Sequence, residues 1–364
     1  MKKILYLFSD TGGGHRASAN ALIAAVAKID PKVKQEMIDV FAECSSFLNI
    51  FAKLYAPVIR YSPKLWGNLY HFWDDPKKLE LLEKVATPFI QKELIERINL
   101  IKPNLIVSVH PMVNHLVANG LPGLPIITVA TDPIAIHKAW VYPKVDLLVV
   151  ATEEAKKLAI EYGMPEEKIK VLGLPINPRF IEKKKKREVR KMLGLLEKVP
   201  TILFMGGGEG SGGMGKLVTT VDEKVKNIQM IVICGRNNLL LNKLSKARFQ
   251  HPAKVVGFTD QVPMLMDAAD IIVTKGGPGS IAEAMAKDLP MIITSWLPGQ
   301  EEANVKFVEE AGIGFVETAP DRVADKVNIL LKTKEADKIR QNIKKVSRPH
   351  ASIDIAKCIL SYLK

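Results

Sequence analysis

The sequence predicts an α/β protein of two domains, each built on a parallel β-sheet with crossover helices. Short apolar runs rich in β-branched residues alternate with helical patterns along the whole chain. A length of 364 residues, 47% of them hydrophobic, exceeds one ordinary core and excludes disorder. The two prolines of Leu174-Pro175-Ile176-Asn177-Pro178 then divide the apolar runs into two series, as an interdomain linker would.

The first domain is predicted over residues 1–178. The run Ile4 to Phe8 reads as its first strand and leads into Gly12-Gly13-Gly14 and a helix. Three further buried strands are expected at residues 105–109, 126–129 and 147–150. Such a strand, glycine and helix sequence is typical of a Rossmann-like domain.

The second domain is predicted over residues 179–346 and opens in the same way, with a strand at 201–205 followed by Gly206-Gly207-Gly208. Further strands are expected at 230–234, 254–256, 271–274 and 291–294. A last helix at about 347–364 carries an apolar stripe, but periodicity does not show which domain it packs on.

The net charge of +13 is concentrated in part in one segment. Residues 179–191 hold eight basic and two acidic side chains. The segment could attract anionic lipid headgroups, or it could be a solvated linker and helix start, which we favour. A nucleic-acid partner is not expected, because the basic run has no interleaved aromatic residues and no reading motif.

Targeting and redox signals are few. No apolar run reaches the roughly 18 residues that cross a bilayer, and Asp10 interrupts the opening strand before it could serve as a signal sequence. We therefore expect a cytoplasmic protein. Cys44, Cys234 and Cys358 are too widely spaced for a disulfide framework or a zinc site, so reduced thiols are expected.

The segment Thr274 to Glu283, with sequence TKGGPGSIAE, is the most informative motif. A strand leads into a glycine loop, and Ser280 with Glu283 is predicted to form a capping box that starts a helix. Free N–H groups and the helix dipole would make this loop a diphosphate site. The alternative is a tight strand-to-helix turn that uses glycine and binds nothing.

The loop after the next strand, Pro298 to Asn304, is expected to border the same edge of the sheet, because ligands collect at the carboxyl ends of parallel strands. Its Gln300 amide and Glu301 carboxylate are suitable partners for sugar hydroxyls. The alternative is a polar helix start at the surface.

With these motifs in view, the chain resembles the monogalactosyldiacylglycerol synthase and processive diacylglycerol glucosyltransferase group of glycosyltransferase family 28, which is similar to the peptidoglycan glucosaminyltransferase that builds lipid II. The resemblance covers nearly the whole chain in order. The matching motifs are Asp10 to Ser18, Ser108 to Pro111, Thr131-Asp132, His137 to Trp140, Gly173 to Ile176, Met205 to Gly210, Cys234 to Asn237, Gly257-Phe258, Lys275 to Glu283 and Pro298 to Glu301.

The resemblance implies a GT-B fold, in which two Rossmann-like domains face each other across a cleft, together with inverting chemistry, a UDP-sugar donor and a lipid acceptor. It also implies that the last helix crosses back to the first domain. The donor-binding positions it implies are Phe258 and Thr259 for uracil, Glu283 for ribose, Gly277, Pro278, Gly279 and Ser280 for the diphosphate, Gly207 and Gly208 beside the phosphates, Gly14 in the first glycine loop, Arg236 at the nucleotide, and Gln300, Glu301 and Asn304 for the sugar.

His15 is the expected general base, since it ends the first glycine loop and an ordinary histidine pKa near 6.5 suits proton uptake. The alternative is a histidine that only caps the helix. Asp132 is expected to orient His15 or to act in its place, while His110 and His137 are candidates for the acceptor side. No metal or other cofactor is expected, because Asp74-Asp75 precedes a proline turn and does not follow a buried strand.

The acceptor is expected to be diacylglycerol at an anionic membrane surface, with the protein peripheral on the inner face of the cell membrane. Residues 41–73 hold nine of the 23 aromatic residues, near several lysines, as in segments that lie between headgroups and acyl chains. An amphipathic helix buried on its own domain explains this pattern as well. The open alternatives for function are a polyprenyl-diphosphate-linked transferase, a UDP-sugar epimerase and a non-catalytic UDP-sugar sensor, and the sugar remains open.

Overall fold

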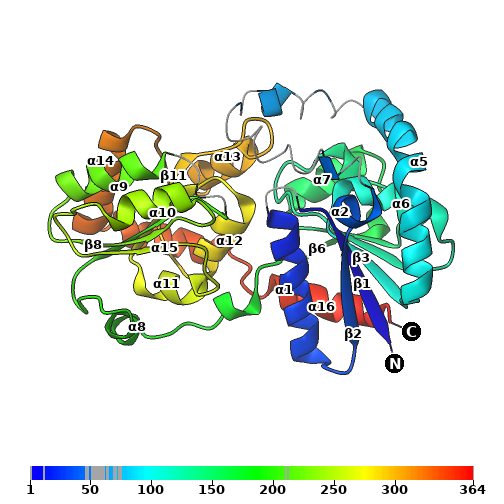
Figure 1. Ribbon diagram of the computed structural model, residues 1–364, viewed down its shortest axis with the longest axis horizontal. Coiled ribbons are helices and arrows are strands. Elements are labelled where there is room, and N and C mark those ends of the chain that lie inside the picture. Colours follow the sequence, from blue (N-terminus) through cyan, green and yellow to red (C-terminus); the bar gives the residue numbers. More distant parts are fainter. Residues whose placement is uncertain are drawn as a thin grey trace. The chain divides into compact units, whose positions relative to one another are not determined.

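The computed structural model divides into two compact units (Figure 1). Unit 1 contains residues 1–178, 298–300 and 350–364, and unit 2 contains residues 179–297 and 301–349. The structure describes residues 2–10, 13–45, 49–50, 62, 65–68, 72, 76–208, 210 and 213–363. Within these ranges, no helix combines the length and the apolar composition that crossing a bilayer requires.

Unit 1 is built on a six-stranded parallel sheet with strand order β2-β1-β3-β4-β5-β6. Its strands are β1 (Lys3–Phe8), β2 (Lys34–Asp39), β3 (Leu105–Ser108), β4 (Ile126–Val129), β5 (Leu147–Val150) and β6 (Ile169–Val171). Its helices are α1 (Gly14–Ile29), α2 (Val40–Cys44), α5 (Pro76–Ile101), α6 (Asn114–Gly120), α7 (Glu153–Glu161) and α16 (Ala351–Ser361), with short 3-10 turns η1 (Pro111–Val113), η2 (Lys138–Trp140) and η3 (Glu166–Lys168).

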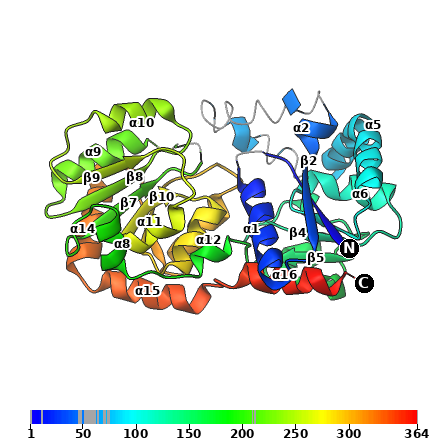
Figure 2. The ribbon, with the colours of Figure 1, turned by 60° about the horizontal axis from the view of Figure 1, so that its bottom comes forward.

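Helices cover both faces of this sheet, which explains why β1 is apolar at nearly every position. On one face, Tyr6 and Phe8 pack with Leu22 of α1 and with Ile355 and Ile359 of α16. On the other face, the alternate β1 residues belong to a second core cluster, which also contains residues of α5, α6 and α7. Figures 1 and 2 show α16 beside α1, so a helix from the far end of the chain completes the core of unit 1.

Unit 2 is built on a second six-stranded parallel sheet with strand order β12-β11-β10-β7-β8-β9. Its strands are β7 (Thr201–Met205), β8 (Gln229–Ile233), β9 (Ala253–Val256), β10 (Ile271–Lys275), β11 (Met291–Ser295) and β12 (Gly314–Val316). Its helices are α8 (Lys186–Met192), α9 (Met214–Lys224), α10 (Asn238–Ser245), α11 (Val262–Ala268), α12 (Pro278–Ala286), α13 (Glu302–Glu310), α14 (Pro320–Lys332) and α15 (Glu335–Val346), and the 3-10 turn η4 (Pro178–Phe180) precedes them.

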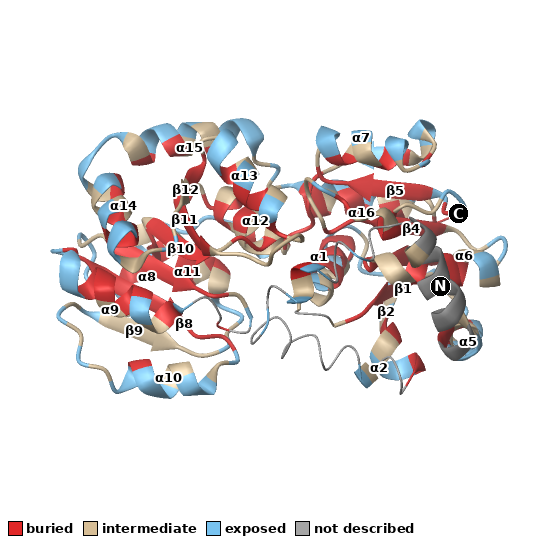
Figure 3. Cartoon of the chain, turned by 90° about the horizontal axis from the view of Figure 1, so that it is seen from above, coloured by how far each residue is buried: buried red, intermediate tan, exposed pale blue. Residues whose placement is uncertain are grey.

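The central strands of both sheets are buried while many helix faces are exposed (Figure 3). The opening of unit 2 differs from the sequence expectation in one respect. The helix after Gly206-Gly207-Gly208 begins only at Met214, so these glycines form a longer loop and do not lead directly into the helix.

The basic segment 179–191 is held on unit 2 by carboxylates. Lys186 and Arg190 both contact Asp270, and the Arg190 guanidinium is buried. Lys183 pairs with Asp288. The acidic partners neutralise part of the basic run, which favours the interpretation of the segment as a linker and helix start.

Each sheet has one topological switch point, a pair of neighbouring strands from which the chain continues toward opposite edges of the sheet. In unit 1 the chain proceeds outward from β1 to β2 and then returns to β3 on the other side of β1, and in unit 2 β8 and β10 lie on opposite sides of β7. Loops at the carboxyl ends of neighbouring strands separate at such a point and leave room for a ligand. The strand pairs β1/β3 and β7/β10 are therefore where a ligand site is expected in each unit.

Candidate active site

The first turn of α12 follows β10 at the switch point of unit 2. Gly277 is the N-cap and Pro278 is the first helical residue, a position that suits proline because its missing N–H would have no helical acceptor. The N–H groups of Gly279 and Ser280 also have no acceptor within the helix. A Cβ atom at Gly279 would meet no atom within 4 Å, so this turn is open to a ligand.

The capping box expected between Ser280 and Glu283 is wrong. Ser280 lies inside α12, at its third residue, and no side chain caps the helix. Pro278 can begin the helix three residues earlier than a Ser280 N-cap would, because its fixed φ suits that position. The anion-binding character of the turn does not depend on the box, because it arises from the backbone N–H groups.

The glycine loop after β7 packs closely against the turn after β8. Gly207 and Gly235 both have positive φ, +72° and +58°. The Arg236 N–H donates to the Gly208 carbonyl at 2.8 Å, and a Cβ atom at Gly235 would lie only 2.3 Å from that same oxygen. Glycine at 235 is therefore required by both the backbone conformation and the neighbouring chain.

Arg236 and Phe258 form a stacked pair beside this loop. The Arg236 guanidinium lies 4.4 Å from the centre of the Phe258 ring, and Phe258 is 64% exposed. A Cβ atom at Gly208 would lie 3.3 Å from the Arg236 Nη1 atom. Thr259 starts the next turn by accepting the Gln261 N–H at 3.1 Å. An exposed aromatic side chain beside a glycine loop suits a nucleotide base.

Glu283 lies one turn into α12 and is partly exposed. Burial raises the pKa of its carboxyl to about 8. At neutral pH in the donor-free protein the carboxyl therefore carries a proton and can both donate and accept a hydrogen bond.

Glu301 is the buried acid of the loop after β11. One carboxylate oxygen contacts the Lys275 ammonium at 2.8 Å, and the other accepts the Leu297 N–H at 2.9 Å. Asn304 is also buried and donates to the Gly276 carbonyl at 3.2 Å. Glu301 and Asn304 thus lie beside the α12 turn, as expected. Both oxygens of the Glu301 carboxylate already have a hydrogen-bond partner, so a sugar hydroxyl would have to compete for them.

Gln300 precedes Glu301 in the sequence, and Lys275 contacts the Glu301 carboxylate. Gln300 belongs to the segment 298–300 of unit 1, where its side-chain oxygen accepts a hydrogen bond from Trp66 at 3.1 Å. Lys275 lies in the motif Thr274 to Glu283, but the sequence predicted no role for it. A lysine at the end of an otherwise apolar strand, directly before a glycine loop, is the signal that could have identified it.

In unit 1, His15 lies at the start of α1, beside the end of β3. Gly13 is the N-cap with φ +82°, and Gly14 is the first helical residue. The His15 Nδ1 atom lies 2.8 Å from the Val109 carbonyl and 3.2 Å from the Thr131 hydroxyl. Because a carbonyl can only accept, Nδ1 carries the proton and the lone pair of the neutral ring is on Nε2.

The pKa of His15 differs from the expected ordinary value. Burial lowers it to about 4, and this outweighs the opposing effects of the Val109 carbonyl and Asp10. The ring is therefore neutral at physiological pH and ready to accept a proton, although it is a weaker base than an exposed histidine.

His110 and Asp132 lie on the loops around His15. The His110 ring packs edge-on against His15 with centroids 4.7 Å apart, and burial lowers its pKa well below the ordinary value. Asp132 accepts a hydrogen bond from the buried Trp140 indole at 2.6 Å. The contacts that orient His15 thus include Val109 and Thr131, which belong to the matching motifs but for which the sequence predicted no role. His137 caps the turn η2 through the Ala139 N–H.

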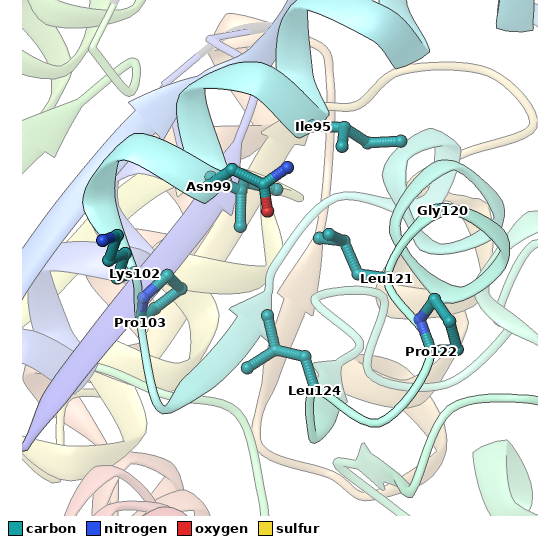
Figure 4. Close-up of a pocket in the computed structure, with 9 residues that line it drawn as sticks. Ile95, Asn99, Lys102, Pro103, Gly120, Leu121, Pro122 and Leu124 are labelled. Atoms are coloured by element: carbon teal, nitrogen blue, oxygen red, sulfur yellow. The ribbon is translucent and has the colours of Figure 1, made fainter.

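A hollow of about 350 Å³ in unit 1 lies apart from these residues (Figure 4). It is lined by Ile95 and Asn99 of α5 and by Leu121 and Leu124, which precede β4. It therefore opens at the amino ends of the strands, opposite the edge that carries His15.

Across the described residues, no group of three or more His, Cys, Asp or Glu side chains is arranged to hold a metal ion. Asp74 and Asp75, and most of the aromatic segment 41–73, lie outside the described residues.

Comparison with known proteins gives two family matches that together cover most of the chain. Residues 15–176 match the family model of monogalactosyldiacylglycerol (MGDG) synthase, and residues 201–354 match the glycosyltransferase family 28 C-terminal domain. The chloroplastic monogalactosyldiacylglycerol synthase of Spinacia oleracea is 35% identical over 97% of this chain and 71% of its own length. Monogalactosyldiacylglycerol synthase 2 of Arabidopsis thaliana is also 35% identical, over 98% of this chain and 80% of its own length.

Solved structures support the fold at low sequence identity. MurG of Acinetobacter baumannii aligns with a TM-score of 0.61 and 13% identity, over 99% of this chain and 100% of that one. Anabaena HepE in complex with UDP-glucose aligns with a TM-score of 0.56 and 15% identity, over 99% of each chain. From its two Rossmann-like units and these relatives, the chain belongs to the monogalactosyldiacylglycerol synthase family of GT-B glycosyltransferases and is a UDP-sugar-dependent hexosyltransferase.

Proposed function

We propose that the protein transfers a hexose from a UDP-hexose to the free hydroxyl of diacylglycerol, with inversion at the anomeric carbon. The proposed role of His15 as the general base rests on its tautomer, which is fixed because its Nδ1–H is directed to the Val109 carbonyl. This leaves Nε2 to receive a proton from an acceptor hydroxyl. The named relatives are monogalactosyldiacylglycerol synthases, so UDP-galactose is the first donor to test.

In the proposed reaction, the acceptor oxygen attacks the anomeric carbon and its proton passes to Nε2 of His15. The bond between that carbon and the β-phosphate oxygen breaks, and UDP leaves with the electron pair. The proposed donor site is on unit 2, with the diphosphate at the N–H groups of Gly279 and Ser280. The base is proposed to lie on Phe258 and Thr259, beside Arg236, and the ribose at Glu283.

The sugar is proposed to lie near Glu301 and Asn304, with Gln300 beside them. Gly207 and Gly208 would line the phosphates from the β7 side. Asp132 is proposed as a positioning residue, because it holds the buried Trp140 indole and so fixes the loop that carries Thr131. No metal is proposed, since the helix turn supplies the dipoles that stabilise the leaving diphosphate.

The decisive experiment incubates the purified protein with UDP-galactose, UDP-glucose or UDP-N-acetylglucosamine and vesicles that contain diacylglycerol, and identifies products by mass. We expect a glycosyl-diacylglycerol. Product formed only with a polyprenyl diphosphate would replace the proposed acceptor, and release of a free epimerised sugar would replace transfer altogether. UDP binding without any turnover would indicate a sensor.

His15 is tested by a matched pair of variants. His15→Ala removes the base, and His15→Gln keeps an amide able to donate to the Val109 carbonyl. We expect both variants to lose transfer at least about 100-fold while UDP binds as before, because general-base catalysis contributes roughly 10²–10⁴-fold. Near-normal turnover in either variant would exclude His15 as the base.

We further propose that the protein works peripherally on the inner face of the cell membrane and contacts anionic lipid there. The support is a set of exposed apolar side chains in the described part of the aromatic segment, Ile50, Leu65 and Phe72, which are 56%, 50% and 47% exposed. Such side chains, close to lysines, suit the boundary between headgroups and acyl chains.

Vesicle sedimentation tests this placement. Serine at Ile50, Leu65 and Phe72 together is expected to weaken binding to anionic vesicles while UDP affinity is unchanged. Serine at Leu100 and Leu239, which are 82% and 76% exposed, is the control for a general loss of apolar surface. Equal vesicle binding by the triple variant and the wild type would contradict the proposal.

A further inference from the structure

Lys275 and Glu301 form an ion pair inside the proposed donor site of unit 2. The ammonium lies 2.8 Å from the Glu301 carboxylate, whose side chain is only 5% exposed, whereas the Lys275 side chain is 26% exposed. The other carboxylate oxygen accepts the Leu297 N–H at 2.9 Å. The acid is thus anchored at two points, and the lysine is the partner that solvent or a ligand can reach.

The lysine side chain runs between the two glycine turns that flank the switch point. A Cβ atom at Gly277 would lie 3.3 Å from the Lys275 ammonium, and one at Gly207 would lie 3.1 Å from its Cε atom. Gly277 is the N-cap of α12, and a Cβ atom at Gly279, in the first turn of that helix, would meet no atom within 4 Å. The ammonium is therefore at the position where a diphosphate on this helix turn would carry its negative charge.

The pair is also chemically matched to the donor. A diphosphate competes well for an ammonium, because charge-assisted hydrogen bonds to phosphate oxygens are strong and the flexible four-carbon stem of lysine can follow them. The Glu301 carboxylate, in contrast, is buried, and losing one partner leaves an oxygen that requires a new donor. The hydroxyl groups of a hexose attached to that diphosphate are such donors.

We propose that Lys275 binds the donor diphosphate, and that by leaving Glu301 it makes the Glu301 carboxylate available to the hexose hydroxyls. This inference rests on the proposed placement of the donor on unit 2. The exchange couples recognition of the two halves of the donor, since the phosphates prepare the sugar site. During transfer, the same ammonium neutralises the charge that UDP gains as the glycosidic bond breaks.

The first test compares UDP with uridine by calorimetry. Lys275→Met is expected to weaken UDP binding about 10- to 100-fold, the range for loss of a hydrogen bond to a charged group. Uridine affinity is expected to stay unchanged, because it lacks the diphosphate. Lys306→Met removes an exposed lysine of α13 and is the control. Unchanged UDP binding, or equal weakening of UDP and uridine, would overturn the assignment of Lys275.

The second test addresses the exchange itself. Glu301→Gln releases the lysine but weakens the sugar contact, so UDP affinity is expected to be kept or increased while the KM for UDP-hexose rises about 10-fold or more. A fall in UDP affinity with no change in that KM would overturn the exchange. If the wild-type protein binds no UDP at all, the proposed donor site fails, a result distinct from either outcome for Lys275 and Glu301.

Discussion

Replacing Gly235 with alanine tests how tightly the nucleotide side of the site is packed. An alanine at φ +58° pays the left-handed backbone strain of about 1–2 kcal/mol. Its Cβ atom would also lie 2.3 Å and 2.8 Å from the carbonyl oxygens of Gly208 and Gly207, so the loop after β7 must move by about 1 Å to reach ordinary contact. Overpacking of this kind costs about a further 1–3 kcal/mol.

The matched control is Gly194→Ala. Gly194 belongs to the same unit and has φ +72°, but a Cβ atom there would meet nothing within 4 Å. Urea unfolding followed by circular dichroism is expected to show a loss of about 1–2 kcal/mol for Gly194→Ala and about 2–5 kcal/mol for Gly235→Ala.

Calorimetry with UDP completes this test. Only Gly235→Ala is expected to weaken UDP binding, because only this substitution displaces the loop that contains Gly207 and Gly208. Equal stability losses in the two variants, or wild-type UDP affinity in Gly235→Ala, would refute the packing argument.

Four further predictions concern the site. Because desolvation lowers the pKa of His15 to about 4, the ring is neutral above that value. We therefore expect kcat to be constant from about pH 6 to 8 and to fall only as pH approaches 4. An inflection of kcat near pH 6.5 would contradict the lowered pKa. Because burial raises the pKa of Glu283 to about 8, UDP affinity should rise as pH increases through 8 and the carboxylate forms. This pH dependence of UDP affinity should vanish in Glu283→Gln. If it persists in that variant, another group is responsible for it. Thr131→Val should lower kcat by roughly 3- to 10-fold, which corresponds to the loss of one hydrogen bond, with little change in the KM for the donor. Thr131→Ser keeps the hydroxyl and should keep kcat near the wild-type value. An equal loss of kcat in both variants would contradict a role for the hydroxyl. Transfer should continue in excess EDTA, and complete loss that a divalent ion restores would show that a metal is needed.

The sequence predicted most of the sheet framework, because strands covered by helices on both faces are continuous apolar runs that stand out. It missed β2, β6 and β12. The strand β2 is at a sheet edge. Its first four residues alternate exposed side chains, Lys34 and Glu36, with half-buried ones, so it lacks that signal. β6 and β12 have only three residues each, too few for periodicity to show.

For the candidate site, the glycine turns were predictable and several side-chain partners were not. The motif around Gly277 indicated an anion site because its chemistry is local to the backbone. The contact of His15 with Val109, and that of Glu301 with Lys275, join residues far apart in the sequence, and only the strand order brings them together. The lowered pKa of His15 was missed for the same reason, since burial is a tertiary property.

The position of α16 has a consequence for how the protein is made. Ile355 and Ile359 fill the same core as Leu22 of α1, yet the ribosome polymerises them after all of unit 2. The first half of a nascent chain therefore emerges with an uncovered apolar groove, whereas unit 2 can close its own interior sooner. Unit 1 is thus the first to be synthesised but the last to be completed, and it is the part of the nascent chain that would benefit from a chaperone.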